Sequence, residues 1–233
     1  MRNIIILTAM ALTVCSCNVE TGSGNIISEN RQVGSFEGVQ ASGSIDVNVQ
    51  SGPEDQVVIE ADDNILKYII TEVDNGVLEI HYKSNTNFRN THITAHVIGK
   101  DLNRLYVSGS GNIKVTNIIK NDDRIQVKVS GSGDISAILD VPKVEAESSG
   151  SGNITLRGKC KNFEADMSGS GDLKSSELLA ENADVSIAGS GTASVHCSVK
   201  LKARASGSGS IYYSGNPQDQ QINKSGSGSV EKR

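Results

Sequence analysis

The chain has 233 residues with a formal net charge of −5, and only 3% of its residues are aromatic. Its basic residues are scattered and few aromatic side chains accompany them, which argues against a surface that binds nucleic acid. Large side chains for an ordinary globular core are scarce, yet the chain contains 24 glycines and only 3 prolines. No collagen-like triplet accounts for these glycines, so we expect them to serve a regular, repeated structure.

The first residues have the features of an export signal. Arg2 provides a positive charge, and an apolar stretch over residues 4–14 is too short to span a bilayer. It ends in Val14-Cys15-Ser16-Cys17, which resembles the lipobox of bacterial lipoproteins because a small serine precedes Cys17. We predict a signal peptide over residues 1–16, then lipidated Cys17 and a flexible Gly/Ser-rich tether over residues 17–31. The alternative is an ordinary secretory signal with two incidental cysteines.

A glycine-rich motif recurs through the rest of the chain. Ser-Gly-Ser-Gly, or Ala-Gly-Ser-Gly in one copy, occurs seven times, and the first glycines of successive copies are 18 to 22 residues apart. Apolar and polar residues alternate around each copy, which indicates a strand with one buried face. The glycines share the apolar parity, so we predict that they point inward and are structural. They are Gly43, which precedes a similar alternation, and the pairs Gly109/Gly111, Gly131/Gly133, Gly150/Gly152, Gly169/Gly171, Gly189/Gly191, Gly207/Gly209 and Gly226/Gly228.

Such closely spaced strands leave no room for the helical crossover of a βαβ unit. We therefore predict an all-β fold, a single-stranded, right-handed parallel β-helix (a β-solenoid) with one coil per 18–22 residues. The regular repeats occupy residues 101–233. Residues 32–100 lack the glycine pairs, and we expect them to form an irregular N-terminal cap that is continuous with the solenoid, so that residues 32–233 make one domain.

Local signals mark elements within this N-terminal part. Val57–Ala61 and Val77–Tyr82 have the alternation of strands. Asp74-Asn75-Gly76 is a strong hairpin signal, because asparagine and glycine both tolerate the positive φ that tight hairpin turns require. Asp62–Tyr68 could form one short helical turn.

Three features together resemble a known family: the lipobox, the opening Val33-Gly34-Ser35-Phe36-Glu37-Gly38-Val39, and the repeated Gly-Ser-Gly-Asn/Asp strands. The chain is similar, from Val33 to its C-terminus, to the auto-transporter adhesin "head GIN" domain, a family of unknown function common in envelope lipoproteins of Bacteroidetes. The resemblance implies a single-stranded β-helix and an adhesive role. It transfers no catalytic or binding residue.

Parallel β-helices also include polysaccharide lyases and hydrolases, so a carbohydrate-active enzyme is the main alternative. The residues that follow Gly-Ser-Gly include Asp134 and Asp172, but these lie two coils apart, roughly 10 Å, with Asn153 between them. We expect this column to bond local backbone groups rather than to catalyse. The repeated serines lie in no nucleophile-elbow sequence. We predict no catalytic residue, no cofactor and no enzymatic activity.

The sequence predicts no metal site either. Only two of the seven copies continue with aspartate, which does not supply the six or more oxygen ligands that Ca²⁺ takes. His92 and His96 lie on the polar side of one predicted strand, about 13 Å apart, too far to share one metal ion. Cys160 and Cys197 fall two coils apart, so we predict two free thiols, with Cys197 buried.

These observations favour a binding or structural module of the cell envelope, such as an adhesin head. We expect a lipid anchor in a membrane, with the outer membrane favoured, and partners such as glycans or envelope and host-surface proteins. A carbohydrate-active enzyme and a self-assembling envelope component that forms homo-oligomers remain the alternatives.

Overall fold

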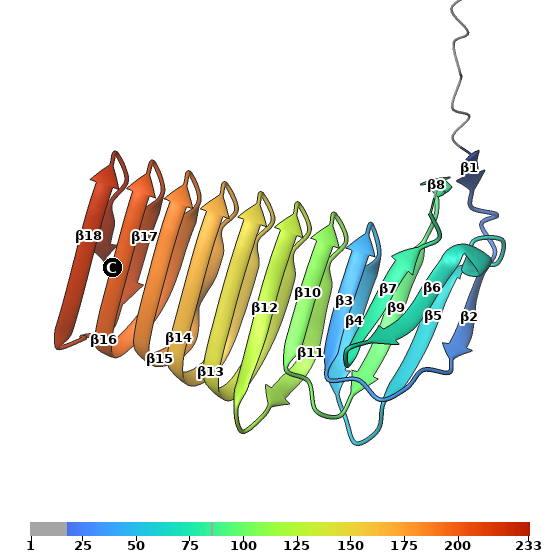
Figure 1. The fold of residues 1–233 in the computed structure, drawn as a ribbon, viewed down its shortest axis with the longest axis horizontal. Coiled ribbons are helices and arrows are strands. Elements are labelled where there is room, and N and C mark those ends of the chain that lie inside the picture. Colours follow the sequence, from blue (N-terminus) through green and yellow to red (C-terminus); the bar gives the residue numbers. More distant parts are fainter. Residues whose placement is uncertain (1–17, 85) are drawn as a thin grey trace, which may run out of the picture.

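The computed structural model describes residues 18–84 and 86–233, so the predicted signal peptide and Cys17 lie outside the described residues. Figure 1 shows a row of stacked coils that extends from an N-terminal cap to strand β18 (Asp219–Gly226). Neighbouring coils pair in parallel, which confirms the predicted β-solenoid. No helix in the described residues is both long and apolar enough to cross a membrane.

Each coil has two walls that meet at the glycine motif. Strands of the first wall end at this motif: β3 (Gly38–Gly43), β10 (Arg104–Gly109), β12 (Arg124–Gly131) and β18. Strands of the second wall follow it: β4 (Asp46–Ser51), β11 (Ile113–Lys120), β17 (Ser210–Ser214) and β19 (Val230–Lys232). Four long strands bend from a second wall into the next first wall: β13 (Ile135–Gly150), β14 (Ile154–Gly169), β15 (Leu173–Gly189) and β16 (Thr192–Gly207).

Equivalent residues of successive coils form columns because the strands pair in register. One inward column of the first wall consists of Leu105, Val127, Ala146, Ala165, Val185 and Ala203, all buried. The period-two alternation of the sequence therefore produces a thin, continuous apolar core. Burying one such Val, Leu or Ile side chain stabilises the fold by about 1.5–3 kcal/mol relative to leaving it in water.

The glycine motif makes the tight turn between the walls, and its two glycines differ. Gly171 is buried, as predicted, and a Cβ there would lie 2.0 Å from the Gly152 carbonyl oxygen of the preceding coil. Gly169 is exposed, so the prediction that both glycines face the core is wrong for this one. Its φ of +134° disfavours any side chain, and a Cβ would lie 2.2 Å from the Gly150 carbonyl oxygen. Close approach of stacked backbones thus explains both positions.

The same division holds along the solenoid. First-position glycines with positive φ are Gly43, Gly109, Gly131, Gly150, Gly169, Gly189, Gly207 and Gly226. Buried second-position glycines are Gly111, Gly133, Gly152, Gly171, Gly191 and Gly209, and Gly228 in the last coil is partly exposed.

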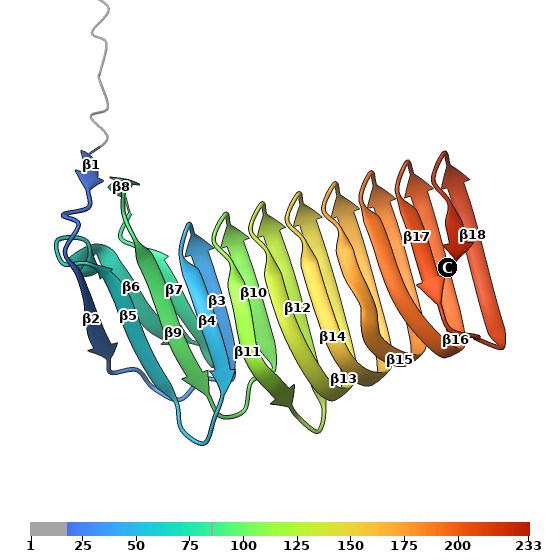
Figure 2. The same cartoon turned by 180° about the vertical axis from the view of Figure 1, so that it is seen from behind.

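An N-terminal cap covers the first coil. It consists of β2 (Ile26–Arg31), β5 (Gln56–Asp62), the 3₁₀ turn Leu66–Tyr68, β6 (Ile69–Asp74), β7 (Val77–Tyr82) and β9 (Ile93–Gly99). β7 and β9 pair in parallel with β3 and β4 and so continue the two walls, whereas β2, β5 and β6 add antiparallel strands (Figure 2). The β6–β7 hairpin turns at Asn75 and Gly76, both with positive φ, where the sequence predicts it.

The region predicted as a flexible tether is ordered from Asn18 on, which corrects that prediction. β1 (Asn18–Thr21) pairs with β8 (Thr86–Arg89), and β2 pairs with β5. Between β1 and β2, backbone and side-chain groups bond to Asp62, Asp63 and Asn64. Gly/Ser-rich composition indicates a free linker only when no such partners exist, and these partners are distant in sequence.

Three inward columns that are mostly apolar along the solenoid end in polar residues at its C-terminal coil. Buried Leu201, Ala205 and Tyr213 are followed, in the outermost coil, by Gln220, Lys224 and Lys232. These three residues have inward parity, yet Gln220 and Lys224 are exposed, because within the described chain no further strand pairs with the outer edge of β18. Terminal repeats of solenoids need such polar surfaces to remain soluble.

Candidate functional site

The outward side of the first wall carries three columns of polar side chains over consecutive coils. We call this surface the ladder face and define it by its columns: Lys143, Asn162, Asn182 and Lys200; Gln126, Glu145, Glu164, Asp184 and Lys202; and Lys128, Glu147, Asp166, Ser186 and Arg204. Parallel register places each residue beside its equivalent in the next coil, at about 4.8 Å. The ladder face is thus an array of charged and amide groups with the spacing of the coils.

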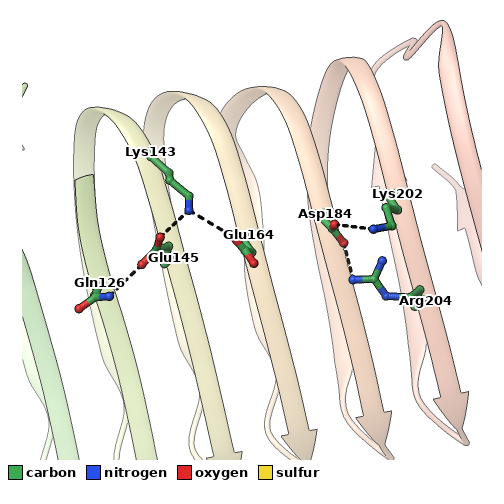
Figure 3. Close-up of polar contacts among 7 residues, drawn as sticks. All are labelled: Gln126, Lys143, Glu145, Glu164, Asp184, Lys202 and Arg204. Atoms are coloured by element: carbon green, nitrogen blue, oxygen red, sulfur yellow. Dashed lines mark hydrogen bonds and ion pairs between the residues drawn. The ribbon is translucent and has the colours of Figure 1, made fainter. Parts of the chain in front are cut away.

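A polar cluster centred on Lys143 and Glu145 spans three coils on this face. The Lys143 ammonium group contacts Glu145 and lies 3.2 Å from a carboxylate oxygen of Glu164, while the Gln126 amide donates a hydrogen bond to Glu145 at 2.9 Å (Figure 3). The hydrogen bond from Lys143 lowers the pKa of Glu145, and the same bond, with one to Glu164, raises the pKa of Lys143. Glu145 is therefore held in its ionised form.

Asp184 is the centre of a second charged group, nearer the C-terminus. One of its oxygens accepts a hydrogen bond from Lys202 at 3.1 Å, and the other accepts one from Arg204 at 2.8 Å (Figure 3). The Arg204 Nε group also donates to the Ser186 hydroxyl at 2.9 Å. Two cations share one carboxylate, so this end of the ladder face carries a positive excess.

A groove of about 550 Å³ crosses the ladder face over β10, β12, β13 and β14. It is lined by Tyr106, Gln126, Val127, Lys128, Lys143, Glu145, Ala146, Glu147, Glu164 and Asp166. The Tyr106 hydroxyl donates to the Gln126 side-chain carbonyl at 2.8 Å, and Lys128 lies 2.9 Å from Glu147. Four carboxylates face two ammonium groups in this groove, which therefore carries a negative excess.

A second groove, of about 610 Å³, lies where the long strands bend from one wall to the next. Its lining consists of Asn121, Asp122, Asp140, Val141, Pro142, Lys159, Cys160, Lys161, Leu179, Ala180, Glu181, His196 and Ser198. Bulges shift the pairing register of β15 with β16 at this edge. Leu179 is 55% exposed there, beside the ion pair of Lys159 and Asp140 at 3.5 Å.

Within the described residues the two cysteines, Cys160 and Cys197, are free, as predicted, and both are buried, although burial was predicted only for Cys197. Cys160 and Cys197 belong to one column, with Ala180 of the intervening coil between them. Burial raises the pKa of the Cys160 thiol to about 12, and burial also raises that of Cys197. Both thiols therefore stay protonated at neutral pH, which argues against either as a nucleophile.

The structure brings together one group of possible metal ligands that the sequence analysis missed. Glu72 and Glu79 face each other across the β6–β7 hairpin, and His81 lies 2.9 Å from Glu72, so that ligand atoms of all three lie within 4.8 Å of one another. Knowing the hairpin turn, one could have paired Glu72 with Glu79 from the sequence. His92 and His96 lie on the polar side, as expected, each near one oxygen of Glu60, at 3.5 and 3.7 Å.

Residues 35–217 match the family described as "Putative auto-transporter adhesin, head GIN domain". The chain belongs to this family. This confirms the resemblance stated from the sequence, over most of the solenoid and its cap. The search of curated proteins finds no match.

Solved structures share the fold over nearly the whole chain. A putative adhesin from Bacteroides fragilis is 22% identical, with a TM-score of 0.83 over 92% of this chain and 100% of its own. From Parabacteroides distasonis, a putative adhesin (27% identity, TM-score 0.71) and a putative lipid binding protein (25%, 0.76) each align over 93% of this chain and 100% of their own. The family and these neighbours are thus described as adhesins or as a binding protein, and none of the three neighbours as an enzyme.

Proposed function

We propose that this head GIN domain protein is a cell-envelope lipoprotein, anchored through Cys17 with the outer membrane favoured, whose solenoid binds glycan chains in the groove of the ladder face. The groove carries the proposal, because it extends over four strands and offers carboxylates, ammonium groups, one side-chain amide and one tyrosine to an extended ligand. Polar side chains held on strands give hydrogen bonds of fixed direction, and Tyr106 offers an apolar ring with a polar tip.

The charges in the groove favour binding over hydrolysis. A glycosidase needs one carboxyl group with a raised pKa to act as general acid. Lys143 instead lowers the pKa of Glu145 and lies 3.2 Å from Glu164. Glu147 is paired with Lys128. The adhesin descriptions of the family and its neighbours agree with a binding role.

A glycan array probed with residues 18–233, followed by calorimetry on the best glycan, tests the binding role. We expect Tyr106→Ala and Asp166→Asn to weaken binding at least about tenfold, the cost of one or two lost hydrogen bonds or ring contacts. Tyr212→Ala is the matched control, because Tyr212 lies on the second wall and packs against Arg233. Loss of binding in all three variants, or in none, would refute the groove as the glycan-binding site. Release of reducing ends from a bound polysaccharide would show an enzyme instead.

Membrane fractionation tests the anchor. Cys17→Ala should move the protein to the soluble fraction, whereas Cys15→Ala should leave it in the membrane, because only Cys17 follows a small residue. The reverse pattern would show that the lipobox is misplaced, and release in neither variant would show that no lipid anchor holds the protein.

A further inference from the structure

The first described residues of the chain are fastened directly to the N-terminal cap. The pairing of β1 with β8 runs from Asn18 to Thr21, so it begins one residue after Cys17. The Gly22 N–H then donates to the Arg89 carbonyl at 3.2 Å. A lipid on Cys17 would therefore hold the cap with hardly any free chain between them.

The loop that follows β1 is fixed just as firmly. Asp62 is only 2% exposed, and its two oxygens accept the backbone N–H groups of Gly24 at 2.8 Å and His92 at 2.9 Å. The bond from His92, followed by that from Gly24, lowers the pKa of Asp62. Asn64 accepts the Ser23 N–H at 3.0 Å and donates to the Thr21 carbonyl at 2.8 Å. These bonds oppose any peeling of β1 away from the cap.

One side of the β1–β8 pair faces outward beside this attachment. Register places Val19 next to Asn87 and Thr21 next to Arg89, so these side chains share one side, and Val19 is 52% exposed. The other side packs on the cap, because Tyr68 donates to Glu20 at 2.8 Å and its ring lies 5.9 Å from that of Phe88.

Two lysines lie next to Tyr68, beside this strand pair, and Arg89 lies on the outward side of the pair. Lys67 lies over the Tyr68 ring at 4.9 Å, and the Lys83 backbone N–H donates to the Tyr68 carbonyl. Lys67, Lys83 and Arg89 are exposed, and in the described part of the chain none of them forms a salt bridge. We define the docking face as Val19, Lys67, Lys83, Asn87 and Arg89.

We propose that the docking face rests on the lipid headgroups of the membrane that holds Cys17, so that the coils extend away from that membrane. This rests on the proposed lipid anchor. Each lysine or arginine near an anionic membrane adds a favourable electrostatic contribution, and the anchor raises the local concentration of lipid so that weak contacts suffice. In Figure 1, β1 and β8 lie at one end of the molecule and β18 at the other, which places the ladder face beyond the cap.

The absence of tryptophan from the sequence allows a direct test. Single reporters Asn87→Trp, on the docking face, and Ile222→Trp, in the outermost coil, are introduced into the lipidated protein. Each is reconstituted into phosphatidylethanolamine–phosphatidylglycerol vesicles with a spin-labelled headgroup. We expect strong quenching at position 87 and none at position 222. A flexible Gly-Ser insertion of about ten residues after Cys17 should reduce the quenching at 87, and high salt should reduce it as well.

Two triple charge-reversal variants, one on the docking face and one near the opposite end, provide the test and its control. With the Asn87→Trp reporter, Lys67→Glu, Lys83→Glu and Arg89→Glu together should abolish most of the quenching. Lys224→Glu, Lys232→Glu and Arg233→Glu, three equal changes near the other end, should leave it unchanged. Vesicle-bound protein without quenching at 87, or with equal quenching at both reporters, would overturn the docking face while leaving the anchor intact. Protein that does not bind the vesicles at all would overturn the lipoprotein proposal itself.

Discussion

The side-chain amide of Asn153 donates a hydrogen bond to Asp134 of the preceding coil at 2.9 Å, and its carbonyl accepts the backbone N–H of Asp172 in the next coil at 3.0 Å. The same pattern connects Asp46, Asn112, Asp134, Asn153, Asp172 and Thr192. Each side chain before Thr192 accepts a backbone N–H from the following coil. Because Asp and Asn alternate, no two carboxylates are direct neighbours in this column.

Replacing Asn153 with Asp would place three carboxylates in successive coils, roughly 4.8 Å apart, and remove the amide donor. We expect a loss of about 1–3 kcal/mol in the free energy of unfolding at neutral pH. Repulsion raises the pKa of the new carboxyl group, so the loss should diminish as the pH falls and this group becomes protonated. Urea unfolding at neutral pH and at an acidic pH measures this loss of stability. Asn48→Asp is the control, because its register neighbours are His96 and Lys114. Equal losses at both pH values would refute the role of charge.

Asp62→Asn should loosen the segment after β1. Both oxygens of Asp62 accept backbone N–H groups, so an amide would turn an NH₂ group toward one of these donors. We expect a cost of about 1–3 kcal/mol and faster hydrogen exchange at Gly24 and His92. Since the native pKa of Asp62 is lowered, its contribution is complete above the ordinary carboxyl range and is lost as the pH falls through the native pKa. The exposed neighbour Asp63→Asn should cost less, and equal effects would contradict this account.

Gly169→Ala and Gly171→Ala should each destabilise the solenoid by several times the cost of an ordinary surface substitution, which lies within about 0.5 kcal/mol. In both variants the methyl group would collide with a carbonyl oxygen of the preceding coil, and Gly169 also has a positive φ. Ser170→Ala, between them and exposed, should be almost neutral. Thermal unfolding measures all three. Tolerance at Gly169 together with intolerance at Gly171 would show that inward packing, and not the stacked backbones, sets the requirement.

Cys160 and Cys197 should react with a thiol reagent only after denaturation, without any reductant, because both are buried and free. Ala180 lies between them in the same column. Ala180→Cys would therefore place a third thiol one coil from each, at about 4.8 Å between Cα atoms, which a disulfide can span. We expect this variant, once oxidised, to retain one reactive thiol. Three reactive thiols would contradict the register of these coils.

Gln220→Leu combined with Lys224→Val should promote self-association. The change would extend two apolar columns to the outer edge of β18 and remove an inward-pointing charge that protects the edge from pairing. Light scattering after size exclusion should show a higher mean mass than that of the native protein. Lys202→Val on the ladder face removes the same charge away from the edge and should not raise the mass. If both variants behave alike, loss of charge alone explains the change.

The solenoid could be predicted because one period governs it. Val144, Ala146, Ile154 and Leu156 alternate with polar residues, and the glycine spacing sets the length of a coil. The orientation of Gly169 could not be read in this way, since period-two parity holds along a strand and fails through a turn with positive φ. The tether was misjudged for another reason. Its partner Asp62 lies some forty residues away along the chain, and pairing across the cap decides whether the loop is free.

Part of the candidate site could be predicted from the sequence. The coil length of nineteen residues aligns Glu145 with Glu164, and so predicts that they are neighbours. It does not predict that Lys143 bridges them, because that depends on rotamers of long side chains. The second groove depends on the bulges between β15 and β16, which change the register locally and leave no regular signal in the sequence.

The alignment of the coils has a mechanical consequence for a molecule anchored at its cap. Hydrogen bonds between neighbouring coils point along the long axis, and β13 pairs with β14 almost continuously from Ile135 to Gly150. A tensile force between the membrane and a bound ligand would therefore act on all bonds of one such interface together rather than open them one at a time. We expect the solenoid to resist extension and then to unfold abruptly, one coil interface at a time. The first interface to separate should be the one with the fewest paired residues.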